Sequence, residues 1–231
     1  MKFDKYEIIA RLFPAIICIT PIFALGWFFP SLEVLNFFEK VYAIKMVANI
    51  SISAIFVFLL AQSNRLVSKE VFEKKFFDNG LSFPTTELLL HSDNTFSKEF
   101  KKKIYNRISE NFGLSLSSEK EEKDNTITAR KKVNEAVSFI RKKVGNGILL
   151  FQHNIEYGFF RNLVGGSATA CALSLINIII FSTLSYNIVA LKISCITFII
   201  YFIPVIFSRK IIFTSGKYYA KVLIEEYMSI K

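Results

Sequence analysis

Long uncharged apolar stretches alternate along the chain with strongly polar ones. Residues 12–32, 46–64 and 162–191 carry no charged side chain. A helix of about 20 apolar residues spans the hydrocarbon core of a bilayer, which is about 30 Å thick. The pattern therefore predicts an all-α integral membrane protein, in which four transmembrane helices form two hairpins that flank a helical cytosolic segment.

The first predicted hairpin takes residues 1–64, with transmembrane helices at about residues 12–30 and 46–64. Pro21 lies near the middle of the first span and is expected to kink it, because proline has no N–H to donate within a helix. Between the spans, residues 33–45 place apolar side chains at helical spacing. That spacing favours a short amphipathic helix at the outer membrane interface.

The second predicted hairpin takes residues 162–208. The uncharged stretch at 162–191 is too long for a single span, and residues 185–187 read as a tight turn. We therefore expect the third transmembrane helix at about residues 163–184 and the fourth at about 188–207.

The segment between the hairpins, residues 65–161, has the composition of a water-soluble region. Apolar residues recur at helical spacing over residues 97–112 and 127–144, which predicts two amphipathic helices. A shorter helix is expected at residues 87–91, with one of the two preceding threonines as its N-cap. Residues 115–125 show no apolar periodicity and predict an exposed linker.

Lys and Arg clusters follow the second and fourth spans and precede the third, whereas the turn between the third and fourth spans has none. Because cytoplasmic loops are enriched in these residues, we expect both termini and the central segment in the cytoplasm of a bacterium, with the spans in its inner membrane. Residues 209–231 predict a C-terminal amphipathic helix on the same side. This topology accounts for the net charge of +10 and disfavours nucleic acid as a partner.

No arrangement of residues along the chain points to catalysis, a metal or a cofactor. The three cysteines, Cys18, Cys171 and Cys195, lie in apolar runs without metal-ligand spacing. The two histidines, His91 and His153, belong to no HExxH pattern, and no glycine-rich phosphate loop is present. We therefore expect a protein that is not an enzyme and that holds no metal and no cofactor.

Four polar residues inside the predicted spans are candidates for a function in the membrane. Asn49 and Ser53 share a helix face in the second span, and Ser174 and Asn177 share one in the third. Unpaired polar groups avoid lipid, so these side chains face other helices or water. They are candidates either for contacts between helices or for the lining of a pore.

The chain resembles an uncharacterised family of bacterial four-transmembrane proteins. The resemblance covers nearly the whole chain and is most specific in two blocks: Phe83-Pro84-Thr85-Thr86-Glu87-Leu88-Leu89 with Ser92-Asp93-Asn94-Thr95, and Leu150-Phe151 with Asn154 and Tyr157-Gly158-Phe159-Phe160-Arg161-Asn162. It implies a membrane effector of antiviral defence that damages the inner membrane. The polar residues of these blocks are our candidates for an interface or sensing site: Thr85, Thr86, Asp93, Asn94, Asn154, Tyr157, Arg161 and Asn162.

Two hypotheses of function follow. In the first, the protein forms homo-oligomers and perturbs or permeabilises the membrane when its cytosolic segment receives a signal, either a cytosolic protein or a small anionic molecule. In the second, it is a non-conducting anchor or scaffold that recruits a cytosolic partner. The lipid bilayer is a partner in both.

Overall fold

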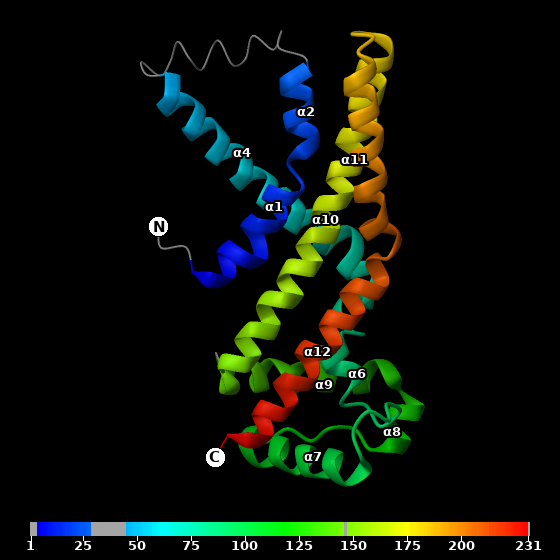
Figure 1. The fold of residues 1–231 in the computed structure, drawn as a ribbon. Helices are drawn as coiled ribbons and strands as arrows, with labels where there is room; N and C mark the ends of the chain where they lie inside the picture. The colour runs from blue at the N-terminus through cyan, green and yellow to red at the C-terminus, as the bar shows by residue number, and fades with distance from the viewer. Residues whose placement is uncertain (1–3, 29–44, 146, 231) are drawn as a thin grey trace. The chain divides into compact units, whose positions relative to one another are not determined.

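The computed structural model describes residues 4–28, 45–145 and 147–230, and for residues 45–53 it describes the backbone only. Every element in these ranges is a helix, which confirms the all-α prediction for the described chain. The helices divide into two compact units (Figure 1). Unit 1 comprises Met1–Phe72 and Gly158–Ile211, and unit 2 comprises Glu73–Tyr157 and Ile212–Lys231. The interfacial helix expected at residues 33–45 lies outside the described residues.

Unit 1 contains the helices that correspond to the predicted spans. In chain order its helical segments are η1 (Glu7–Leu12), α1 (Phe13–Ile17), α2 (Thr20–Phe28), α4 (Lys45–Val67), most of η2 (Ser68–Glu73), the larger part of α10 (Ile148–Thr183) and α11 (Ile188–Ile206). Both η segments are wider π-helical turns, which continue directly into the α-helix next to them. The predicted turn at residues 185–187 separates α10 from α11, and Tyr186 adopts a positive φ of 47° there.

Two helices, α10 and α11, are long and apolar enough to cross a membrane, and the bent pair Glu7–Ile17 and Thr20–Phe28 makes a third if it forms one span. The fourth predicted span corresponds closely to α11. The third lies within α10, which ends near the expected residue but begins at Ile148, before the predicted start at about residue 163. The second, residues 46–64, lies in α4, whose side chains are described only from Ala54 onward. The chain therefore has the helices of a membrane protein, with two to three candidate spans among the described residues.

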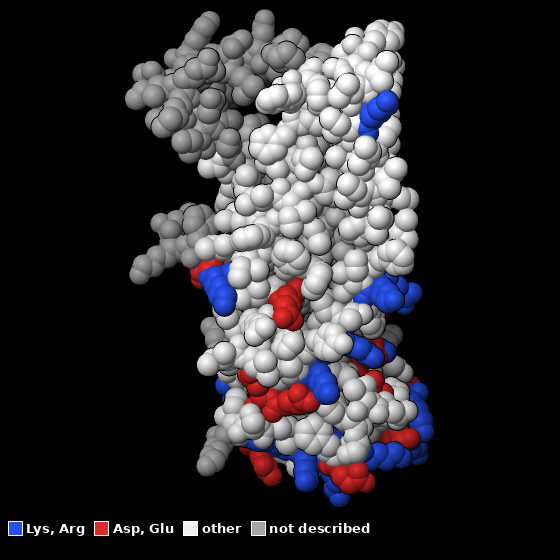
Figure 2. Space-filling model, viewed as in Figure 1, with Lys and Arg blue, Asp and Glu red and all other residues white. Residues whose placement is uncertain are grey.

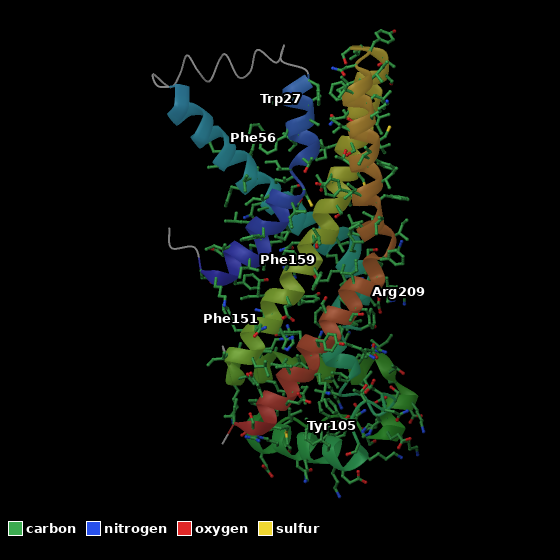
Figure 3. The ribbon with its side chains drawn as sticks, in the orientation of Figure 1. Trp27, Phe56, Tyr105, Phe151, Phe159 and Arg209 are labelled. Atoms are coloured by element: carbon green, nitrogen blue, oxygen red, sulfur yellow. The ribbon has the colours of Figure 1, made fainter. Side chains whose placement is uncertain are left out.

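Unit 1 exposes many of its large apolar side chains and buries several of its polar ones. Trp27 is 83% exposed and Phe56 is 46% exposed (Figure 3). Many Ile residues of α10 and α11 are also exposed. On the face drawn in Figure 2, the surface over α10 and α11 is almost free of charge. A protein in water would bury such side chains, whereas lipid solvates them, so this distribution matches a membrane environment.

The first predicted span is broken rather than continuous. It begins earlier than expected, at Glu7, and its two halves meet at an angle of 41° across Cys18 and Ile19. The kink expected at Pro21 is therefore present, but it lies on the N-terminal side of the proline. Pro21 occupies the first turn of α2, where a missing N–H is tolerated, so the helix is interrupted in the turn before it.

Unit 2 is a cluster of helices around an apolar core. Its helical segments are α5 (Lys74–Phe76), η3 (Asp78–Gly80), α6 (Pro84–Glu87), α7 (Lys98–Phe112), α8 (Glu119–Asp124), α9 (Thr126–Val144), the first turns of α10 and most of α12 (Ser208–Ser229). Ile104 and Ile108 of α7 meet Val133, Ala136, Val137 and Ile140 of α9 in this core, together with Val222, Leu223, Ile224 and Tyr227 of α12. The C-terminal helix, expected only as amphipathic, is thus part of the core of unit 2.

The helices predicted at residues 97–112 and 127–144 are confirmed almost to the residue by α7 and α9. Their ends are fixed by local chemistry. The Ser97 hydroxyl accepts the Phe100 N–H, and Gly113 ends α7 in the left-handed conformation at φ 66°. The Asn125 side chain accepts the Thr128 N–H at the start of α9.

Two predictions for this region were wrong. The short helix expected at residues 87–91 instead spans Pro84–Glu87, because proline is favourable in the first helical turn and so begins the helix rather than preceding it. Neither threonine caps it, since both lie inside the helix and are buried. The linker expected at residues 115–125 contains α8, which begins with a reciprocal capping box between Ser118 and Glu121.

Candidate functional site

Polar side chains of α10 and α11 bind backbone carbonyls of the broken first span. Pro14 and Pro21 have no N–H to offer the carbonyls four residues before them, those of Ala10 and Ile17. The Asn162 Nδ2 donates to the Ala10 oxygen at 2.6 Å. The Tyr201 hydroxyl donates to the Ile17 oxygen at 2.5 Å. Side chains from two other helices therefore replace the hydrogen bonds that the prolines remove, as membrane helices require.

A third contact of this kind involves a residue singled out by the sequence. Asn177 of α10 is 1% exposed, and its Nδ2 donates to the Pro21 oxygen at 2.7 Å. One turn earlier, the Ser174 hydroxyl lies 3.2 Å from the Thr197 hydroxyl of α11. Both candidates are thus bound within the chain, which favours the helix-contact interpretation for them. The side chains of Asn49 and Ser53 lie outside the described residues, and their role stays a prediction.

Helix α10 closely approaches the junction of α4 and η2. A Cβ on Gly165 would lie 2.3 Å from the Asn64 backbone oxygen and 2.8 Å from the Ser68 nitrogen. The Ser68 hydroxyl also donates to the Arg161 carbonyl, and Ser68 is fully buried. Small residues allow this proximity of backbones, as in other membrane helix pairs. The Asn64 amide is buried beside this crossing without a hydrogen-bond partner for either end.

The predicted sensing residues fall into separate parts of the fold. Arg161 and Asn162 are buried in unit 1. In unit 2, the Tyr157 hydroxyl donates to Glu73 Oε1 at 2.9 Å, while Asn154 is half-buried. Thr85 and Thr86 are also buried in unit 2, where the Thr85 hydroxyl accepts from Arg141 at 3.4 Å.

Asp93 and Asn94 lie together on a segment that three neighbouring side chains hold in place. The Lys101 ammonium donates to the carbonyls of Leu90 and Asp93, and the Tyr105 hydroxyl donates to that of Leu89. On the other side, Glu122 of α8 accepts the N–H groups of His91 and Ser92 at 2.7 and 3.0 Å. Segment 89–93 is therefore fixed by α7 and α8, although it contains no regular helix of its own.

Burial shifts the pKa of two of these groups. It lowers the pKa of the Lys101 ammonium, while the Asp93 and Glu122 carboxylates oppose that change. It also raises the pKa of the Tyr105 hydroxyl, to which the charge of Glu122 contributes. Tyr105 therefore keeps its proton at neutral pH and remains a hydrogen-bond donor.

Several residues of these contacts were not singled out from the sequence: Asn64, Ser68, Lys101, Tyr105, Glu122, Gly165 and Tyr201. A signal existed for some of them. Two adjacent glycines in a membrane helix indicate close packing, and a proline in a span indicates a carbonyl that needs another donor. No local signal marked Lys101 or Glu122, because their partners are backbone groups distant in sequence.

Within the described residues, there is no group of three or more His, Cys, Asp or Glu side chains that could hold a metal ion. Comparisons with protein-family models, with curated proteins and with solved structures gave no match. The structure combines an apolar-surfaced unit, whose broken helix is held by polar contacts, with a charged helical unit that carries a fixed polar segment.

Proposed function

We propose that the protein is a four-span membrane effector whose unit 2 receives a cytosolic signal and whose unit 1 then opens a path for ions in an oligomer. The observation that carries the proposal is the set of side-chain contacts to the carbonyls of Ala10, Ile17 and Pro21. Such contacts can form or break without unfolding a helix, which suits a switch between two packings. Four helices fill their own centre, so a water path requires self-association.

Continuity along the chain supports transfer of a signal. Helix α10 contributes residues 148–157 to unit 2 and residues 158–183 to unit 1. A change at its first turns can therefore reach Asn162 and Asn177 along one continuous helix. The proposed setting, defence in a bacterial inner membrane, is supported by the resemblance of residues 83–95 and 150–162 described above.

A non-conducting anchor is the second candidate. It is favoured by the placement of Ser174 and Asn177, which already bind partners within the chain and so do not line an open path in this conformation. In that case unit 2 would recruit a cytosolic partner, and the polar contacts of unit 1 would serve only to hold its helices together.

The four-span topology predicts which sites are reached from each side of the membrane. Single cysteines at Asn36 and Tyr186, in a chain without its native cysteines, should react with a membrane-impermeant thiol reagent in intact cells. Cysteines at Ser118 and Ser229 should react only after the cells are opened. If the cysteine at position 118 reacted in intact cells, the topology would be contradicted. The basic residues around this position are the strongest reason to place the central segment in the cytoplasm.

Tyr201→Phe is expected to favour the open state. It removes the hydroxyl that contacts both the Ile17 carbonyl and the Thr20 hydroxyl, at 2.5 and 2.9 Å, and leaves the ring in place. The loss of the hydrogen bond to the carbonyl costs about 1 kcal/mol. That energy corresponds to about a fivefold change in the open population. A potential-sensitive dye should therefore report stronger depolarisation than for the native protein at equal membrane levels.

Tyr186→Phe is the matched control, because this tyrosine is 76% exposed and no hydrogen bond of its hydroxyl occurs among the described contacts. It should behave as the native protein does. If neither the native protein nor Tyr201→Phe changes the membrane potential when overproduced, the effector proposal fails and the anchor is supported.

A further inference from the structure

Unit 2 contains a cavity of about 580 Å³ beside the fixed segment described above. Its walls are residues 91–94 and Phe96, Glu119 at the start of α8, and five residues of α7: Lys98, Lys101, Lys102, Tyr105 and Asn106. Cavities of roughly 300–1,000 Å³ are the usual size for small-molecule sites. Tyr105 (Figure 3) forms part of the wall, with its ring 5.1 Å from that of His91 in an edge-to-face contact.

The inner wall of the cavity is preorganised. Lys101 is 5% exposed, and its ammonium is bound to the backbone carbonyls of Leu90 and Asp93. The His91 ring lies 3.1 Å from the Ser117 carbonyl, through Nε2. A ligand that enters therefore meets a surface already in place, which reduces the conformational entropy lost on binding.

The carboxylates around the cavity are occupied by groups of the protein. Asp93 accepts the N–H and the hydroxyl of Thr95 at 2.8 and 3.1 Å, and lies 4.0 Å from the Lys101 ammonium. Glu119 forms a 2.8 Å ion pair with Lys123, which points along α8. The negative charges at this site are therefore balanced before any ligand arrives.

Four other hydrogen-bond donors of the cavity, unlike these carboxylates, have no partner of this kind among the described contacts. Lys98, Lys102 and Asn106 are exposed, follow one another at intervals of four along α7 and so share a face of it. Asn94 lines the same cavity. Among the described contacts, none is a hydrogen bond or ion pair of these four side chains. The pKa of the Glu119 carboxyl group is lowered mainly by the hydrogen bond and charge of Lys123, and to a smaller extent by the charge of Lys98. Lys98 is also the first residue of α7, where the helix dipole adds positive potential.

We propose that this cavity binds a small phosphate-bearing molecule, with Lys98 and Lys102 on the phosphate and Asn94 and Asn106 on its polar remainder. Two ammonium groups from positions about 6 Å apart at Cβ suit a dianionic group better than a single carboxylate. The cavity is larger than a phosphate alone requires, and Phe96 gives it an apolar wall for a ring. This inference rests on the proposed function only in treating the ligand as the signal.

The test uses the full chain in phosphatidylcholine nanodiscs, titrated by calorimetry with inorganic pyrophosphate and with adenosine diphosphate. Saturable binding of both is expected, tighter for the nucleotide. Lys102→Gln should weaken each affinity about tenfold, because it removes one charged hydrogen-bond donor. Lys103→Gln is the matched control: Lys103 is the next exposed lysine of α7 and does not line the cavity.

Absence of saturable binding by the native chain at millimolar pyrophosphate overturns the proposal, as does equal weakening by Lys102→Gln and Lys103→Gln. Repeating the pyrophosphate titration in nanodiscs that also contain phosphatidylglycerol shows whether the phosphate belongs to a lipid headgroup or to a soluble ligand. Competition of this lipid with pyrophosphate assigns the site to a lipid headgroup, and unchanged affinity assigns it to a soluble ligand. Binding without depolarisation in cells would reject the effector function alone, and depolarisation without binding would reject the phosphate site alone.

Discussion

Gly165→Ala should lower the thermal unfolding midpoint of the purified protein in detergent by roughly 6–12 °C. The added Cβ would lie 2.3 Å from the Asn64 backbone oxygen and 2.8 Å from the Ser68 nitrogen. Backbone atoms cannot rotate away as a side chain does, so α10 must move off the junction of α4 and η2. Overpacking of this kind costs about 3 kcal/mol, and 1 kcal/mol corresponds to about 2–4 °C in a chain of this size.

Gly26→Ala provides the matched control, since nothing lies within 4 Å of a Cβ at that position in α2. It should leave the unfolding midpoint unchanged or raise it slightly, because alanine is the better helix former. A native midpoint for Gly165→Ala would show that α10 does not approach α4 so closely in the membrane protein as it is purified.

Glu122→Ala should destabilise unit 2 by about 3 kcal/mol, as measured by urea unfolding followed through tyrosine fluorescence. Glu122 is 6% exposed and accepts the N–H groups of His91 and Ser92. Without the carboxylate, these two backbone donors lose their partner in a partly buried position. Segment 89–93 should then lose its fixed conformation, and amide hydrogen exchange at His91 and Ser92 should accelerate.

Two variants distinguish this role from a general effect of charge on α8. Glu122→Gln keeps an oxygen acceptor and should have an intermediate effect. Glu119→Ala removes an exposed carboxylate that pairs only with the exposed Lys123, and its effect on unfolding should be small. Equal destabilisation by Glu119→Ala and Glu122→Ala would contradict the assignment of Glu122 as the acceptor for segment 89–93.

The sequence predicted those parts of the fold that depend on local interactions. The uncharged stretches located α10, α11 and the first span, because a bilayer requires a fixed length of apolar helix. In unit 2, Ser97 and Gly113 marked the ends of α7 because capping involves only groups within the same turn. Helix α9 was equally visible from its apolar periodicity.

The errors occurred where a local pattern was weak or absent. The residues of α8 show no apolar stripe, because its buried member is the charged Glu122, which is stabilised by backbone groups about 30 residues earlier in the chain. The short helix at Pro84–Glu87 was misplaced because a proline can either stop a helix or begin one. The break in the first predicted span is close to Pro21, but its position depends on the contacts that α10 and α11 make with that segment.

For the candidate sites, the sequence determined which side chains need a partner, and the tertiary structure decided which partner they have. Asn177 was recognisable as a polar residue that lipid does not solvate, whereas Asn162 was a candidate only through the resemblance. Their acceptors, the carbonyls of Ala10 and Pro21, lie more than 150 residues away in the chain. Likewise, Asp93, Asn94, Lys98 and Lys102 line one cavity. Beside it, Lys101, Tyr105 and Glu122 hold segment 89–93 in place through contacts that no periodicity in the sequence encodes.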